Sequence, residues 1–186
     1  MAVRIIGGQA RGRVLHVGRR ATTRPSSGVV RSALFSILTP YLESVSVLDL
    51  FAGTGALGIE AMSRGAATAD FVEQDTRQCV ALRRNLETLG FTERTRVRGA
   101  RVEQAIASLP GPYDLVLMDP PYNLPHLEDL LERIAVSPLV GSGTVLAVEH
   151  ASRQSLPETF GEIEMVKRRS YGDTSISIYQ HGGEAW

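Results

Sequence analysis

A short polar turn follows one of the buried apolar segments of the chain. Residues 115–118 are all apolar and predict a buried strand, and Asp119, Pro120, Pro121 and Tyr122 come directly after it. Open α/β sheets bind their ligands at the carboxyl ends of the strands. Two prolines fix the backbone and lack N–H groups, so their carbonyl oxygens are free to accept hydrogen bonds from a ligand. The turn therefore predicts a rigid pair of acceptors, although a tight turn capped by an aspartate would use the same residues.

This set of groups suits the activation of an aromatic amine. The exocyclic amino group of a nucleic-acid base is a weak nucleophile because its lone pair is delocalised into the ring. The Asp119 carboxylate and the Pro120 carbonyl can accept its two N–H groups and stabilise the positive charge that develops on the nitrogen. Tyr122 can stack on a base that has left its helix. We therefore predict Asp119, Pro120 and Tyr122 as catalytic residues for methylation of a base amine.

A glycine-rich loop links an earlier strand to a helix. Gly53, Gly55 and Gly58 have the spacing of a dinucleotide fingerprint, and Glu73 follows at the end of the next strand, where an acid binds ribose hydroxyls. The loop alone does not separate a nicotinamide cofactor from an adenosyl cofactor. Asp49 favours the second, because its carboxylate attracts a cationic amino-acid group and would repel a pyrophosphate. We predict S-adenosylmethionine as the cofactor, with contacts from Asp49, Phe51, Gly53, Gly55 and Glu73.

The net charge of zero conceals a strong asymmetry. Residues 1–42 contain seven arginines and no acid, whereas the remaining residues contain 13 basic and 20 acidic side chains. A basic segment on an acidic body suggests a polyanionic partner, but it equally fits a solvated terminus or an arm that packs on the acidic body. We predict RNA contacts from five of these arginines: Arg4, Arg11, Arg13, Arg24 and Arg31.

The elements that position these residues alternate between strand and helix. Strands are predicted at residues 45–50, 68–72, 96–98, 113–118 and 144–149, and helices at 56–64, 76–89, 102–109 and 127–135. This order predicts an α/β fold with a mainly parallel sheet covered on both faces. Residues 163–168 and 175–179 are two strands without a helix between them, so an antiparallel C-terminal hairpin is expected. Residues 1–40 predict a separate small module, a β-hairpin and a helix, ahead of a main domain at 41–186.

Several classes of protein are disfavoured by composition. No apolar run approaches the ~20 residues that cross a bilayer, and the first residues lack the apolar core of a signal peptide, so a cytoplasmic protein without membrane contact is expected. Cys79 is the only cysteine, and it lies on an apolar helical stripe with Leu82, Leu86 and Leu89, so a core position is expected. The four histidines have no metal-binding spacing, and no metal is predicted.

The glycine loop, the Asp-Pro-Pro-Tyr turn and the N-terminal block resemble known families. Residues 49–55 resemble motif I, and residues 119–122 resemble the amino-methyltransferase motif IV, of class I methyltransferases. The N-terminal block Arg4-Ile5-Ile6-Gly7-Gly8 with Arg11-Gly12-Arg13, followed by Arg24-Pro25-Ser26 and by residues 30–35, closely resembles the RsmD family. The resemblance implies a seven-stranded class I (Rossmann-like) fold and a monomer. It also implies methylation of guanine N2 in 16S ribosomal RNA, with the small ribosomal subunit or its assembly intermediate as the partner.

The chain departs from the family at two places, and rival functions remain. Acids that the family carries near Gly28 and Ser32 are absent, and residues 98–101 (Arg-Gly-Ala-Arg) lack an acid for the adenine of the cofactor. An adenine-N6 methyltransferase of DNA or RNA can carry the same Asp-Pro-Pro-Tyr turn. Guanine presents two adjacent donors, N1–H and the N2 amine, and a carboxylate can accept both. Asp119 therefore favours guanine over adenine modestly. A nicotinamide oxidoreductase is supported only by the glycine loop, and the intact turn argues against a non-catalytic RNA-binding protein.

Overall fold

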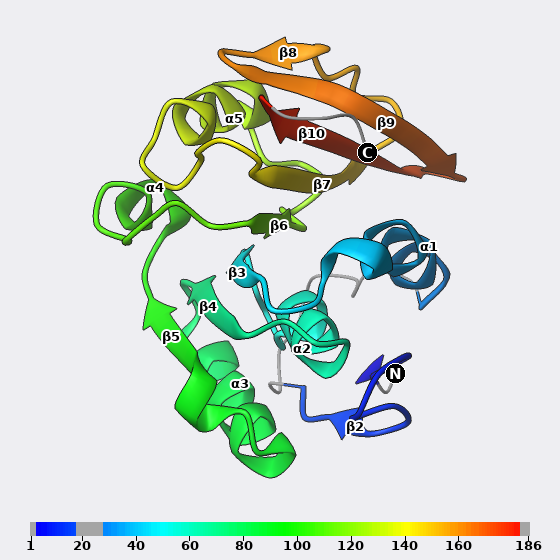
Figure 1. Cartoon of the computed structure of the whole chain (residues 1–186), viewed down its shortest axis with the longest axis vertical. Helices are drawn as coiled ribbons and strands as arrows, with labels where there is room; N and C mark the ends of the chain where they lie inside the picture. The colour runs from blue at the N-terminus through cyan, green and yellow to red at the C-terminus, as the bar shows by residue number, and fades with distance from the viewer. Residues whose placement is uncertain (1–2, 18–27, 183–186) are drawn as a thin grey trace.

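The computed structural model describes residues 3–17 and 28–182 of the 186-residue chain. Within these ranges, eight strands form one mixed sheet in the order β5-β4-β3-β6-β7-β10-β9-β8, and β1 (Val3–Arg4) and β2 (Val14–Leu15) form a separate antiparallel hairpin (Figure 1). No helix in the described part of the chain is long and apolar enough to span a membrane.

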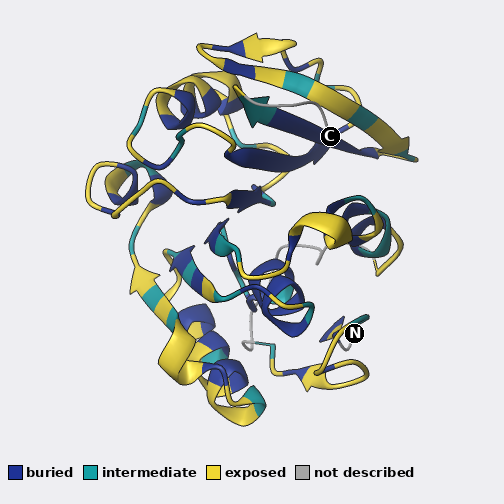
Figure 2. Cartoon of the chain, in the orientation of Figure 1, coloured by how far each residue is buried: buried dark blue, intermediate teal, exposed yellow. Residues whose placement is uncertain are grey.

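The parallel part of the sheet contains five strands. They are β3 (Ser46–Leu50), β4 (Thr68–Glu73), β5 (Thr95–Gly99), β6 (Leu115–Met118) and β7 (Val145–Ala151). All residues of β6 and β7 are buried, because helices cover both faces of these strands (Figure 2). The predicted mainly parallel α/β fold is confirmed.

An antiparallel hairpin completes the sheet beyond β7. β10 (Thr174–His181) pairs with β7 on one side and with β9 (Ile163–Tyr171) on the other. The expected C-terminal hairpin is therefore confirmed. The two-residue strand β8 (Thr159–Phe160) adds one edge strand that the sequence pattern did not predict. Both strands of the hairpin extend beyond their predicted bounds, because each continues to the tight turn at Gly172–Asp173.

Helices cover the two faces of the sheet in separate sets. α1 (Gly28–Leu38), α2 (Ala56–Ser63) and α3 (Thr76–Leu89) contribute to one hydrophobic cluster, and α4 (Val102–Ala105) and α5 (Leu127–Ala135) contribute to the other. Short 3₁₀ turns follow α1 at Thr39–Tyr41 and α3 at Thr92–Arg94. α4 is shorter than the predicted helix at 102–109. The alternating faces of the central strands supply apolar side chains to both clusters.

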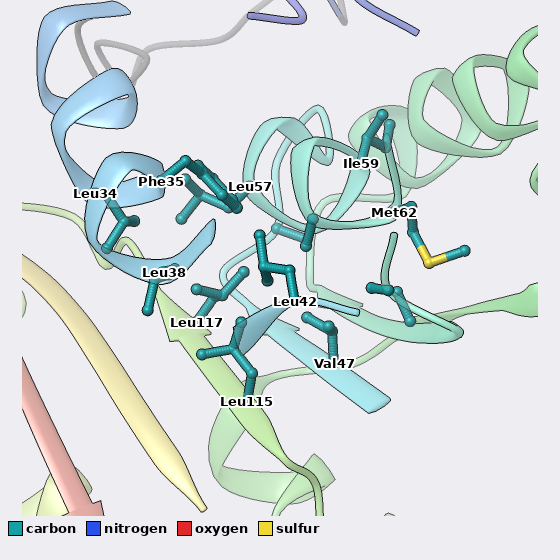
Figure 3. Close-up of a cluster of buried hydrophobic side chains, with 14 of the residues drawn as sticks. Leu34, Phe35, Leu38, Leu42, Val47, Leu57, Ile59, Met62, Leu115 and Leu117 are labelled. Atoms are coloured by element: carbon teal, nitrogen blue, oxygen red, sulfur yellow. The ribbon is translucent and has the colours of Figure 1, made fainter. Parts of the chain in front are cut away.

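The first cluster joins the N-terminal hairpin to the main sheet. Figure 3 shows Phe35 and Leu38 of α1 beside Leu57 of α2, above Leu115 and Leu117 of β6. The same cluster includes four side chains from residues 3–17: Val3, Ile5, Ala10 and Leu15. The hairpin thus shares its core with α1 and α2. The division of the chain into residues 1–40 and 41–186 stays a prediction.

Candidate active site

The predicted cofactor and catalytic residues meet at the carboxyl ends of the parallel strands. After β3 the chain crosses to β4 on one side, whereas β6 lies on the other side of β3, so the strand order reverses between β3 and β6. Leu50 of β3 pairs with Val72 of β4 and with Met118 of β6. The next residues along these three strands, Phe51, Glu73 and Asp119, therefore lie at one level at the carboxyl edge of the sheet. Such a switch point is where open α/β sheets bind ligands.

The glycine loop is held by the Glu73 carboxylate. Glu73 Oε2 accepts a hydrogen bond from Gly53 N at 2.8 Å, and Oε1 accepts one from Asp75 N at 2.7 Å. A carboxylate has about four acceptor positions, so Glu73 retains capacity for the hydroxyls of a ligand. Glu73 is partly exposed at the end of β4. It can both fix the loop and face a ribose.

Left-handed backbone conformations shape the loop. Phe51 has φ 63°, Gly53 has φ 53° and Gly55 has φ 80°. For the non-glycine residue Phe51 this conformation is costly, and such strain gathers at ligand sites. A Cβ on Gly55 would lie 2.2 Å from Leu82 Cδ1 of α3, whereas a Cβ on Gly53 would meet nothing within 4 Å. Gly55 thus allows the loop to pack inward, and Gly53 borders open space.

Asp49 lies beneath the loop and is buried. Its Oδ2 accepts a hydrogen bond from Gly58 N, at the start of α2, at 2.8 Å. The pKa of Asp49 is raised to about 8, mainly by burial and also by the nearby charges of Asp119 and Glu73, while the Gly58 N–H opposes the shift. The carboxyl is therefore mostly protonated at neutral pH. A cation placed beside it would favour its ionised form.

Gly58 lets α2 lie close to the sheet. A Cβ at this position would be 2.3 Å from Phe71 Cε1 and 3.1 Å from Asp49 Oδ2. Any side chain here would push the start of α2 away from β4 and break the hydrogen bond to Asp49. The third glycine of the predicted spacing is thus explained by packing of helix on strand.

The Asp-Pro-Pro-Tyr turn has a buried base and an exposed tip. Asp119 is partly exposed, Pro120 is buried, and Tyr122 is 38% exposed. The Tyr122 hydroxyl hydrogen-bonds to Thr174 Oγ1 of β10 and lies 3.5 Å from Glu149 Oε1 of β7. Its ring is therefore held at the mouth of the site, at the tip of the C-terminal hairpin.

Sequence reasoning missed both partners of Tyr122. Glu149 is 3% exposed, and it lies one residue beyond the Val148 that pairs with Met118, so it is beside Asp119. An acid directly after the apolar residues 145–148 was a usable signal, because it repeats the pattern of Asp119 after residues 115–118. Thr174 gave no such signal, since 52 residues separate it from Tyr122.

The end of β5, where the adenine of the predicted cofactor is expected to lie, carries no acidic side chain. Arg98 of this strand donates from Nη1 to Ser108 Oγ at 3.0 Å, and Ala100 N donates to the Glu73 backbone carbonyl at 3.1 Å. Cys79 of α3 is 2% exposed and its thiol contacts the same Glu73 carbonyl at 3.3 Å. Its predicted core position is confirmed.

Three of the predicted RNA-contacting arginines are exposed on the N-terminal hairpin. Arg4 donates from Nη1 to Gly12 O at 2.5 Å, and Arg13 donates from Nη2 to Thr88 O of α3 at 3.5 Å. Arg11 is also exposed. No ion pair to Arg4, Arg11 or Arg13 occurs within the described residues.

Buried polar side chains of α2 and α3 hold the hairpin instead. Glu60 is fully buried and accepts hydrogen bonds from Ile6 N at 2.8 Å and Gly7 N at 2.7 Å. Ser63 Oγ accepts one from Ala10 N at 2.9 Å and donates to Gly7 O at 2.6 Å. These bonds satisfy backbone groups that the two-residue strands leave unpaired.

Asn85 of α3 connects the hairpin to the glycine loop. Its Oδ1 accepts a hydrogen bond from His16 N at 2.7 Å, and its Nδ2 donates to His16 O and to Thr54 O, both at 3.1 Å. Thr54 lies between Gly53 and Gly55, and Asn85 is 1% exposed. One buried amide therefore fixes the hairpin relative to the loop.

The structure places Arg31 differently from the surface position that we expected. Arg31 is 4% exposed, donates from Nη2 to Arg4 O at 2.7 Å, and has its Nε 4.0 Å from Glu60 Oε2. Burial lowers its pKa, while Glu60, Glu149 and Asp119 raise it. Its guanidinium joins α1 to β1 inside the protein and has no access to an RNA phosphate here. Arg24 lies outside the described residues.

Comparisons with known proteins agree with this architecture. The model of the family described as "Conserved hypothetical protein 95" matches residues 3–180. YlbH of Bacillus subtilis is 34% identical over 184 residues, which cover 97% of this chain and 100% of the relative. Ribosomal RNA small subunit methyltransferase D of Escherichia coli K12 is 33% identical over 178 residues, which cover 96% and 89% of the two chains. The solved structure of yhhF from Escherichia coli aligns with a TM-score of 0.88 at 32% identity, covering 99% of this chain and 100% of that one. The chain therefore belongs to the RsmD family, as the N-terminal block and the Asp-Pro-Pro-Tyr turn predicted.

Proposed function

We propose that this protein is an rRNA methyltransferase that transfers a methyl group from S-adenosylmethionine to the exocyclic N2 amine of a guanine in 16S ribosomal RNA. The observation that carries the proposal is the position of Asp119, at the end of β6 and across the switch point from the glycine loop. Membership of the RsmD family supports the class of substrate, because several relatives are named ribosomal RNA small subunit methyltransferase D.

The residues at the switch point fit the cofactor. S-adenosylmethionine, when bound, supplies a methyl group on a positively charged sulfur, which departs as a neutral thioether. The open space beside Gly53 receives the ligand, and the free acceptor capacity of Glu73 suits its ribose hydroxyls. Asp49 is the buried acid that a cationic amino-acid group would ionise. Phe51 and Gly55 set the course of the loop around it.

The catalytic turn activates the amine. The Asp119 carboxylate and the Pro120 carbonyl accept its two N–H groups and direct the nitrogen lone pair toward the methyl carbon. The carbon–nitrogen bond forms as the carbon–sulfur bond breaks, and Asp119 stabilises the positive charge on nitrogen. The product nitrogen then loses a proton to water. The exposed ring of Tyr122 stacks on the guanine that has left its helix.

The N-terminal hairpin binds the RNA backbone in this proposal. Arg4, Arg11 and Arg13 are exposed on one element and can contact phosphates, which position a substrate without reading its sequence. From the sequence we also propose Arg24, which precedes Pro25, as a contact near the active-site mouth. A monomer acting on the small subunit or its assembly intermediate in the cytoplasm completes the proposal.

Substitution of Asp119 tests the function directly. We expect Asp119→Ala to lower the rate of methyl transfer to small ribosomal subunits by about 10²–10³-fold, because one charge-assisted acceptor is removed, with S-adenosylhomocysteine affinity nearly unchanged. Asp129→Asn, on the exposed surface of α5, is the control. Mass spectrometry of the digested RNA identifies the product. Near-normal turnover of a folded Asp119→Ala protein, or N6-methyladenosine as the product, would contradict the proposal.

A further inference from the structure

The C-terminal hairpin carries a group of cations that the proposed mechanism leaves unused. Lys167, Arg168 and Arg169 are consecutive on β9, and most of this strand is exposed (Figure 2). Asp173, in the turn, is the only acid between residues 165 and 180. No carboxylate of the described residues forms an ion pair with any of the three cations.

The strand register determines where these side chains lie. Lys167 pairs with Ile178 and Arg169 pairs with Ile176, and both isoleucines belong to the cluster beneath α1 and α2. Directly paired residues share a face of the sheet. Lys167 and Arg169 therefore lie on the α1 face and are exposed there. Arg168 lies on the opposite face, where its Nε donates to Ser177 Oγ at 3.3 Å.

α1 lies between this strand and the N-terminal hairpin. It packs on β10 (Figure 1), and the Arg31 side chain donates a hydrogen bond to the Arg4 carbonyl of β1. Arg31 is the only charged residue in α1, and it is buried. The exposed surface of the helix is therefore uncharged. Lys167 and Arg169 lie on this face of the sheet beyond β10, and the N-terminal hairpin with its arginines lies on the other side of α1 (Figure 1).

The C-terminal hairpin also contacts the Asp-Pro-Pro-Tyr turn. Thr174 begins β10, pairs with Tyr171 at the end of β9, and hydrogen-bonds to the Tyr122 hydroxyl. Arg168 and Arg169 thus lie in the half of β9 that is nearest the site and Lys167 lies at its middle, whereas the acids Glu162 and Glu164 lie at the far end, near β8. This polarity along one strand places positive charge beside the mouth of the site.

We propose that Lys167 and Arg169 bind the phosphate backbone of the RNA substrate and form a second contact surface, across α1 from the N-terminal hairpin. The inference rests on the proposed function, which supplies the polyanion. Long cationic side chains that have no carboxylate partner among the described residues, beside a helix surface without acids, attract a phosphate chain and do not repel it. With cations on both sides of α1, the RNA can be held on both sides of the mouth.

The chain offers a selective probe of this surface, because Lys167 is its only lysine. Acetylation by an amine-reactive ester, read by mass spectrometry, reports on Lys167 separately from the N-terminal amine. We expect saturating protein-free small-subunit rRNA to slow acetylation of Lys167 several-fold. An unchanged rate, under conditions where filter binding shows the protein to be saturated with RNA, would overturn the proposal.

Charge removal provides the second test. In Lys167→Gln/Arg169→Gln, the dependence of log affinity on log salt should flatten by about one unit for each phosphate that the protein no longer binds, and the KM for RNA should rise with kcat little changed. Arg133→Gln, exposed on α5 on the opposite face, is the control. RNA binding equal to that of the control at every salt concentration would refute the second surface. Failure of the wild-type protein to methylate rRNA, with the salt slope still flattened, would refute the proposed function alone.

Discussion

Removal of the Glu60 carboxylate should detach the N-terminal hairpin. This carboxylate accepts hydrogen bonds from the backbone of Ile6 and Gly7 and from Arg64 Nε at 2.8 Å, and it faces the buried Arg31. Glu60→Ala leaves these donors without an acceptor in a dry part of the molecule. The substitution creates no clash, so its effect reports on the hydrogen bonds and the ion pair with Arg31 that it removes.

The expected loss of stability follows from these hydrogen bonds. Two backbone N–H groups left unsatisfied cost about 1–3 kcal/mol each, and removal of one partner from a buried ion pair typically costs about 3–5 kcal/mol. Because the hairpin can move and admit water, we expect the free energy of unfolding to fall by about 3–5 kcal/mol. In a domain of this size that corresponds to a fall in Tm of about 6–20 °C.

Urea unfolding followed by circular dichroism measures the free energy, and hydrogen exchange locates the loss. Amides at residues 3–17 should lose protection in Glu60→Ala, and RNA affinity should fall more than S-adenosylhomocysteine affinity. Glu87→Ala, exposed on α3, serves as the control. A free energy of unfolding within about 0.5 kcal/mol of the wild-type value, or an unchanged protection of residues 3–17, would show that Glu60 does not hold the hairpin.

Two further predictions concern the site itself. The pKa of Asp49, raised to about 8 by burial, makes this carboxyl neutral at pH 6, and a cationic ligand must ionise it. S-adenosylhomocysteine affinity should therefore rise by up to about tenfold per pH unit between pH 6 and 8, with release of a proton in calorimetry, and Asp49→Asn should abolish this dependence. An affinity that is constant over this range would contradict a contact with Asp49. Tyr122→Ala removes a stacking surface worth about 1–3 kcal/mol, so kcat/KM for RNA should fall by about 5- to 150-fold. Tyr122→Phe keeps the ring and loses only the hydroxyl contacts with Thr174 and Glu149, so its kcat/KM should fall much less, and equal effects of the two substitutions would refute stacking.

Elements with strong local signals could be predicted from the sequence. Residues 76–89 form the predicted helix with the predicted bounds, because the Asp75 side chain caps its first turn and Gly90, at φ 73°, ends it. The residues that we propose for cofactor binding and catalysis could be brought together because the carboxyl ends of parallel strands share one edge of the sheet. The strand β8 has two residues and is too short to show the alternation of apolar and polar residues from which a strand is predicted.

For Arg31, the charge distribution of the sequence suggested an exposed position, but the side chain is buried. Its charge groups it with the basic arm, yet it lies three residues before Leu34 and seven before Leu38, which places it on the buried face of α1. Helical period would have predicted its burial. Its partner Glu60 could not be predicted, because that pairing depends on how α1 packs against α2. The same holds for Thr174 and Tyr122, whose hydrogen bond depends on the hairpin register.

The anchoring of the hairpin by Asn85 also bears on the entropy of the RNA binding that we propose for it. A flexible basic arm would lose conformational freedom when it binds, and that loss would weaken the complex. Here a buried amide holds His16 and Thr54 together, so residues 3–17 are ordered before RNA arrives. The arginines of the hairpin are thus presented on a preorganised backbone, and only their side chains become restricted. RNA affinity should therefore show little of the enthalpy–entropy signature of coupled folding and binding.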